Sequence, residues 1–103
     1  MQLRNNFSDE TKGLFCFNDE CWSCGDSWGD GNADYHHTLG RISSSPLNLA
    51  PLCLGCHSKH IEMKSPPNQT KFLIKTIKYL LREGYELRKK DIKFYQNNKE
   101  KYK

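Results

Sequence analysis

The 103-residue sequence contains no long apolar segment, either at its start or elsewhere. The residues that follow Met1 are polar, which predicts that no signal peptide is present. No apolar run approaches the roughly 20 residues that cross a membrane. We therefore expect a cytoplasmic protein with no membrane partner.

Apolar side chains are also scarce over the chain as a whole. Hydrophobic residues make up 36% of the sequence and the mean hydropathy is −0.84, so a single domain of this length has a small core. Small domains often add a disulfide or a metal ion for stability. The sequence has five cysteines, and disulfides are rare inside cells, which favours metal binding by reduced thiols.

Four of the cysteines form two Cys-x-x-Cys pairs, Cys21 with Cys24 and Cys53 with Cys56. Thiolates prefer zinc among the common cellular metals, and four of them complete a tetrahedral structural site. The pairs are separated by 28 residues, against about 15 to 20 in a simple zinc ribbon. We expect the zinc ion to clamp the base of an inserted hairpin. The fifth cysteine, Cys16, is either a half-buried neighbour or an alternative ligand.

The segment Cys53-Leu-Gly-Cys56-His57 also matches the attachment motif for c-type haem. That chemistry requires export from the cell, and it would leave Cys21 and Cys24 without a role. We therefore expect no haem.

Charge is distributed unevenly, because residues 1–63 carry a net charge of −4 and residues 64–103 carry +8. A basic half indicates a polyanionic partner, with nucleic acid as the first candidate, although a solvated helix face explains the charge as well. The spacing predicts a helix with an apolar stripe and a basic stripe. The apolar stripe contains Leu73, Ile77, Leu80 and Leu81, and the basic stripe of candidate DNA-binding residues contains Lys71, Lys75, Lys78 and Arg82.

The remaining elements are predicted more coarsely. We expect short strands within residues 33–39 and 47–53 and a helix over residues 54–64, ended by Ser65 and two prolines. The basic helix stops at Gly84, a further helix covers residues 85–96, and residues 97–103 are disordered. Residues 1–64 would form the core, and residues 65–103 a basic helical extension packed on it.

All four histidines lie between Asp34 and His60. The order His36-His37, Asn48, and His57 directly after a Cys-x-x-Cys pair resembles the HNH family of nucleases, in its zinc-braced form with two such pairs. Residues 36–53 also resemble small phage-type members. The resemblance covers about residues 21–60. It implies an α+β fold with a ββα-metal core, in which a two-stranded hairpin with a long loop and then a helix surround one divalent ion.

The resemblance also implies a role for each matching position. His36 and His57 correspond to ligands of a catalytic divalent ion, Mg²⁺, Mn²⁺ or a transition metal, and His37 corresponds to the general base. Asn48 corresponds to the residue that holds the loop and so orients the base. Some members have a further histidine four residues after the second ligand; His60 lies three residues after His57 and is a candidate for that role.

Phosphodiester hydrolysis needs these residue types for physical reasons. A neutral imidazole can accept a proton from water at cellular pH. Adjacent strand residues face opposite sides, so His36 and His37 serve one phosphate only if the backbone turns near His37 or the substrate sits between them. Arg41 is either a catalytic residue that stabilises the transition state or an exposed loop arginine. We interpret Asp34 as a strand-edge acid rather than a neighbour of the metal.

The predicted function is that of a metal-dependent HNH endonuclease that nicks or cuts double-stranded DNA. It would act as a monomer or weak dimer, in the cytoplasm of the host cell if a phage encodes it. The alternative is a zinc-stabilised nucleic-acid-binding module without catalysis. Two non-equivalent metal sites favour the nuclease, and one favours the module.

Overall fold

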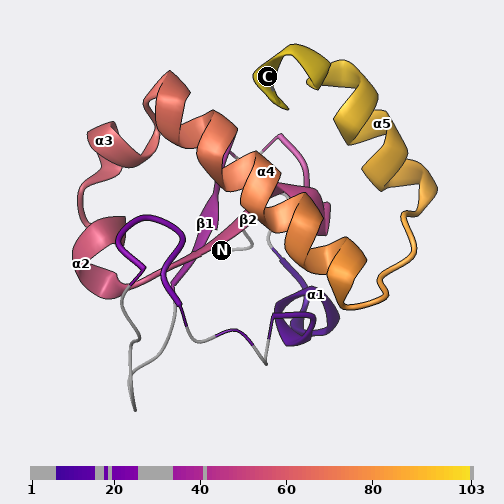
Figure 1. Ribbon diagram of the computed structural model, residues 1–103, viewed down its shortest axis with the longest axis horizontal. Helices are drawn as coiled ribbons and strands as arrows, with labels where there is room; N and C mark the ends of the chain where they lie inside the picture. Colours follow the sequence, from indigo (N-terminus) through magenta and orange to yellow (C-terminus); the bar gives the residue numbers. More distant parts are fainter. Residues whose placement is uncertain (1–6, 16–17, 19, 26–33, 41, 103) are drawn as a thin grey trace, which may run out of the picture.

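A two-stranded antiparallel sheet lies at the centre of the fold (Figure 1). Strand β1 (Asp34–His37) pairs with β2 (Leu49–Leu52), and the register sets His36 opposite Ala50. A 3-10 turn, η1 (Pro46–Asn48), leads into β2. The expectation of an α+β fold is confirmed. The computed structural model describes residues 7–15, 18, 20–25, 34–40 and 42–102.

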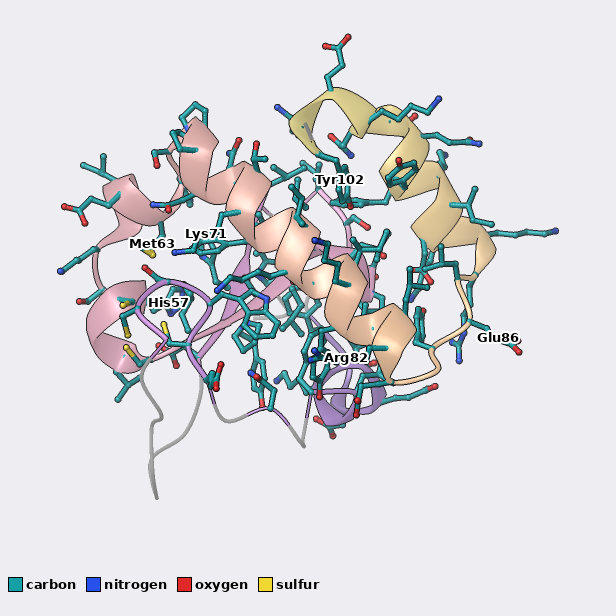
Figure 2. All side chains as sticks on the ribbon, viewed as in Figure 1. His57, Met63, Lys71, Arg82, Glu86 and Tyr102 are labelled. Carbon is teal, nitrogen blue, oxygen red and sulfur yellow. The ribbon has the colours of Figure 1, made fainter. Side chains whose placement is uncertain are left out.

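Helices precede and follow this sheet. They are α1 (Asp9–Gly13), α2 (Leu54–His57), α3 (His60–Met63), α4 (Pro66–Arg82), α5 (Lys89–Asn97) and the 3-10 turn η2 (Lys99–Tyr102). Residues 99–102, which lie in the segment predicted to be disordered, form the turn η2. Tyr102 is half-buried between α4 and α5, and its ring lies 4.8 Å from that of Tyr95 (Figure 2).

The predicted helix over residues 54–64 is two short helices. The chain leaves α2 at Ser58, whose hydroxyl donates to the carbonyl oxygen of Gly55 at 2.7 Å. A serine hydroxyl that bonds to the preceding turn competes with the helical ladder. The next amide, that of Lys59, donates to Cys56 three residues back instead of continuing the α-helical pattern.

Helix α4 begins and ends at residues that suit these positions. Ser65 is its N-cap, and Pro66 and Pro67 occupy its first turn, where the absent amide hydrogens have no helical partner to lose. The two prolines thus begin α4. Gly84 follows its end with φ +84°, and the amides of Gly84 and Tyr85 donate to Leu81 and Leu80. This is the glycine-terminated helix end that the sequence predicted.

Helix α4 crosses the sheet and supplies much of the core (Figure 1). Of the predicted apolar stripe, Leu73 and Leu80 are buried, Ile77 is half-buried, and Leu81 is 54% exposed. The buried face of α4 consists of Phe72, Leu73, Thr76, Tyr79 and Leu80. The buried face is therefore rotated around the helix relative to the predicted stripe, and it includes the polar Thr76, which the prediction omitted.

Thr76 belongs to the buried face because it joins three segments by hydrogen bonds. The indole N–H of Trp22 donates to Thr76 Oγ1 at 2.8 Å, and the Thr76 hydroxyl donates to the carbonyl of Leu49 at 2.7 Å. The Trp22 amide donates to the carbonyl of Pro51 at 3.0 Å. These bonds tie residues 20–25 to β2 and α4 and satisfy carbonyl groups that the core would otherwise leave without partners.

Within the described part of the chain, no helix is both long enough and apolar enough to cross a lipid bilayer.

Two adjacent leucines of α4 test its orientation. Leu80→Ala should lower the free energy of unfolding by about 2–5 kcal/mol, because Leu80 is fully buried. The matched control Leu81→Ala should lower it by about 1 kcal/mol or less. Denaturant unfolding of the protein measures both, and equal losses would contradict the assignment of the buried face.

Candidate metal centre and histidine site

Four thiols converge from two turns that are distant in the sequence. The sulfur atoms of Cys21, Cys24, Cys53 and Cys56 all lie within 4.8 Å of one another. The Sγ atoms of Cys24 and Cys53 are 3.9 Å apart. Four sulfurs bonded tetrahedrally to one ion at about 2.3 Å stand about 3.8 Å apart. The cluster therefore has the size of a four-thiolate metal centre, and the predicted convergence of the two pairs is confirmed.

Each turn has local features that direct its sulfurs inward. In the first turn the Gly25 amide donates to the Cys21 carbonyl at 2.9 Å, and Gly25 adopts φ +79°, which favours glycine. The Ser23 amide donates to the Cys21 sulfur at 3.3 Å. In the second turn Cys53 is the N-cap of α2 and Cys56 lies within it. Short turns with inward amides are suited to holding thiolates.

The thiols differ in how readily they ionise. Burial alone raises the pKa of Cys21, but the backbone amides of Cys24, Cys53 and Ser23 stabilise the thiolate and bring the pKa down to about 7. Burial and hydrogen bonds with neighbouring thiols raise the pKa of Cys56 to about 12. Four such thiolates repel one another unless a cation lies among them, so the cluster suits a metal ion.

A pair of histidines meets beside this cluster. His36, on β1, is buried, and its ring centroid lies 5.4 Å from that of His57 at the end of α2, with the rings inclined at 72°. On another side the His36 ring meets Phe72 of α4 at 6.1 Å. His57 directly follows a cysteine of the cluster, and Figure 2 shows it beside the sulfur atoms. The structure thus brings together two predicted ligands of the catalytic ion.

Asp34 is a site residue whose role the sequence analysis missed. Its Oδ2 atom accepts a hydrogen bond from His57 Nδ1 at 2.8 Å, so it is more than a strand-edge acid. Asp34 and His36 are two residues apart on β1 and face the same side of the sheet. The spacing of two residues between Asp34 and His36 was the sequence signal that could have predicted this role. The carboxylate fixes the orientation of the His57 ring.

His37 lies on the other side of β1. Its ring stacks on Phe7 with centroids 4.1 Å apart and planes inclined at 10°, and it is half-buried. Pairing with β2 is regular up to His37, and beyond it the Thr38 amide donates to the Asn48 carbonyl at 2.8 Å. The backbone is extended through His37 and turns directly after it, where the Gly40 amide donates to the His37 carbonyl at 3.0 Å. A turn therefore lies next to His37, on the loop side of β1.

Asn48 is buried in η1 and holds the loop that follows His37. Its Oδ1 atom accepts from the Leu39 amide at 2.9 Å. Its Nδ2 atom donates to the carbonyls of Gly40 at 2.9 Å and Ser43 at 3.1 Å. These three bonds span the loop between the strands, which is the loop-holding geometry that the family resemblance implies for this asparagine.

Some predicted residues lie outside what the structure describes. Arg41 and Cys16 are outside the described residues, and so is the side chain of His60, whose backbone belongs to α3. Among the described residues, the four cysteines are the one group of three or more His, Cys, Asp or Glu side chains gathered closely enough to hold a metal ion.

The basic residues of α4 lie along one side of the helix but differ in their contacts. The Lys71 ammonium reaches from α4 to the Ser23 carbonyl at 2.8 Å (Figure 2). The Lys75 ammonium lies 6.0 Å from the Trp22 ring, and the Arg82 guanidinium 5.7 Å from the Tyr79 ring. Lys78 is exposed. Lys71 therefore supports the first cysteine turn, and the others extend into solvent.

Comparisons of the chain with protein-family models, with curated proteins and with solved structures give no match. Its function must therefore be argued from its own residues and their geometry.

The four-thiol centre makes a measurable prediction about metal content. The purified protein should bind one ion per chain at this centre, and Cys53→Ser should lose most of it because three thiolates complete the tetrahedron poorly. Elemental mass spectrometry of the dialysed protein measures the ratio. The control Cys16→Ser should keep the ion, and loss of metal in that variant would instead add Cys16 to the ligands.

Proposed function

We propose that this chain is a metal-dependent HNH endonuclease that hydrolyses phosphodiester bonds of double-stranded DNA. One observation carries the proposal: His36 and His57 meet from β1 and α2, and Asp34 orients the second of them. The succession of two antiparallel strands and a short helix around these rings is compatible with the ββα-metal core that the sequence resembles.

The four thiols would hold a structural zinc ion. Zinc suits a closed tetrahedral site of four thiolates, and the spacing of the sulfur atoms fits its bond lengths. In zinc-finger peptides such binding contributes about 10–16 kcal/mol to folding. Because His57 directly follows Cys56, the zinc ion would also fix the start of α2 and with it the position of the His57 ring.

The two histidine rings would hold the catalytic divalent ion. His57 Nδ1 donates to Asp34, so Nε2 would be the metal-binding atom of His57. When bound, a divalent ion polarises the phosphate and stabilises negative charge on the leaving oxygen. Imidazole nitrogens are ligands that such an ion accepts, and the Asp34 carboxylate orients one of these two imidazoles. His60 remains a candidate third ligand.

His37 would act as the general base. Its imidazole takes a proton from a water molecule as the water oxygen attacks the phosphorus atom, and the bond from phosphorus to the leaving sugar oxygen breaks. The leaving oxygen then takes up a proton from solvent. Asn48 holds the following loop and so limits movement of His37. The scissile phosphate would lie at the end of β1, within reach of both His37 on one face of the strand and the ion held by His36 on the other.

The basic side of α4 would contact the sugar–phosphate backbone. Lys75, Lys78 and Arg82 are exposed, and phosphate contacts of this kind position a protein on DNA without reading its sequence. Lys71 is already bonded to the Ser23 carbonyl and would contribute less. Arg41 remains a candidate for stabilising the transition state.

The role of His37 can be tested by plasmid relaxation. The zinc-loaded protein should nick supercoiled DNA when Mg²⁺ or Mn²⁺ is added, and His37→Ala should lower the rate by about 100-fold or more, because a general base contributes about 10²–10⁴-fold. Added imidazole should restore part of the lost rate. DNA binding without cleavage under every divalent ion would instead identify a non-catalytic binding module.

Asp34 should set the metal requirement of the nuclease. Asp34→Asn should raise the Mn²⁺ concentration for half-maximal nicking by about 10- to 100-fold, because a carboxylate that accepts from a ligand histidine raises its affinity for metal. The matched control Asp9→Asn removes an exposed acid of α1 and should leave the titration unchanged. An unchanged Mn²⁺ titration for Asp34→Asn would exclude this role for the carboxylate.

A further inference from the structure

A fully buried carboxylate on α5 has no part in the site described so far. Asp91 is 0% exposed, and it takes part in none of the ion pairs among the described residues. Its neighbour Arg88 directs its guanidinium to Glu10 at 3.1 Å, at the surface. A buried carboxylate without a cation requires several hydrogen-bond donors.

Three donors from different segments reach Asp91. The Ser45 hydroxyl donates to Oδ1 at 2.5 Å, and the Arg88 amide donates to Oδ2 at 2.8 Å. The Tyr85 hydroxyl also donates to Oδ2. Burial, and the bond to Asp91, raise the pKa of Tyr85, so the phenol stays protonated at neutral pH and continues to donate. The carboxylate thus joins α5 and the α4–α5 connection to Ser45.

Ser45 connects Asp91 to Asn48 by hydrogen bonds. Its Oγ atom accepts from the Leu47 amide at 3.2 Å, and its carbonyl accepts from the Asn48 amide at 2.9 Å. Ser45 is therefore the N-cap that shapes η1, the turn that carries Asn48. Asn48 in turn holds the loop after His37 through its bonds to Leu39 and Gly40.

We propose that Asp91 is a positioning residue, through which the C-terminal helix α5 orders the loop between the two strands of the site. The path runs from Asp91 to Ser45, then through η1 to Asn48 and the backbone beyond His37. A network of buried hydrogen bonds specifies one geometry when every member is satisfied. The catalytic part of this inference rests on the proposed nuclease function; the loop-ordering part does not.

Amide hydrogen exchange, followed by NMR on the zinc-loaded chain, tests the loop directly. Asp91→Asn keeps the shape of the side chain but removes one acceptor and the charge. The Leu39 amide donates its hydrogen bond to the side chain of Asn48. Its hydrogen should exchange at least about tenfold faster in Asp91→Asn and in Ser45→Ala than in the wild type. The Trp22 indole N–H, bonded to Thr76 outside this network, should be unchanged. The matched control Glu10→Gln removes the negative charge that faces Arg88 at the surface and should alter neither probe.

Cleavage provides a second readout. At saturating DNA, Asp91→Asn should lower the single-turnover nicking rate by about tenfold with an unchanged Kd for DNA, because buried Asp91 cannot touch the duplex. If the wild-type chain binds DNA but never cleaves it, the proposed nuclease function is wrong. The exchange rate of the Leu39 amide would still decide whether α5 orders the loop.

Two results would overturn the inference. One is a Leu39 amide that exchanges in Asp91→Asn at the same rate as in the wild type. The other is equal acceleration at Leu39 and at the Trp22 indole, which would show general loss of stability. If Asp91→Asn does not fold, Tyr85→Phe decides, because it removes one donor and keeps the carboxylate. Selective acceleration at Leu39 in that variant supports the inference, and its absence refutes it.

Discussion

The convergence of four thiols, within 4.8 Å of one another, determines where the rest of the site can lie. Two turns separated by 28 residues meet there, and the chain between them must return to its starting point as a hairpin. Thiolates at such separations repel one another, so a bound cation is the condition for all four to ionise. Because His57 follows the last cysteine directly, the position of its ring depends on this centre.

Buried polar groups complete a core that has few apolar side chains. Thr76 links Trp22 to Leu49 across the boundary between α4 and β2. The buried side chains of Asn48 and Asp91 each take part in three hydrogen bonds. Such groups stabilise a fold only when their partners are in position. The elements of this chain therefore depend on one another, and α4 and α5 contribute to the shape of the hairpin as well as to its burial.

Local signals predicted local features well. Gly84 ends a helix because glycine readily adopts positive φ, and the repeated Cys-x-x-Cys spacing predicted the thiol cluster because two residues between thiols form a tight turn. Predictions that depend on neighbours in space were less accurate. Leu81 was expected in the core and is exposed, because the buried face is centred on Thr76, whose hydrogen bonds pass to Trp22 and Leu49. The helix predicted over residues 54–64 is interrupted at Ser58, whose hydroxyl competes for a helical carbonyl.

The sequence by itself determined the kinds of ligand present, their grouping into two thiol pairs and a histidine cluster, and the order of strands and helices. These follow from residue type and short-range spacing. Only the tertiary structure decided that Asp34 bonds to His57 and that Asp91 bonds to Ser45. Those partners are 23 and 46 residues apart, and their meeting depends on how the sheet, α2 and α5 pack together. Hydrogen bonds between distant segments leave no periodic pattern in a single sequence, so the orientation of the site side chains appears only when the chain is folded.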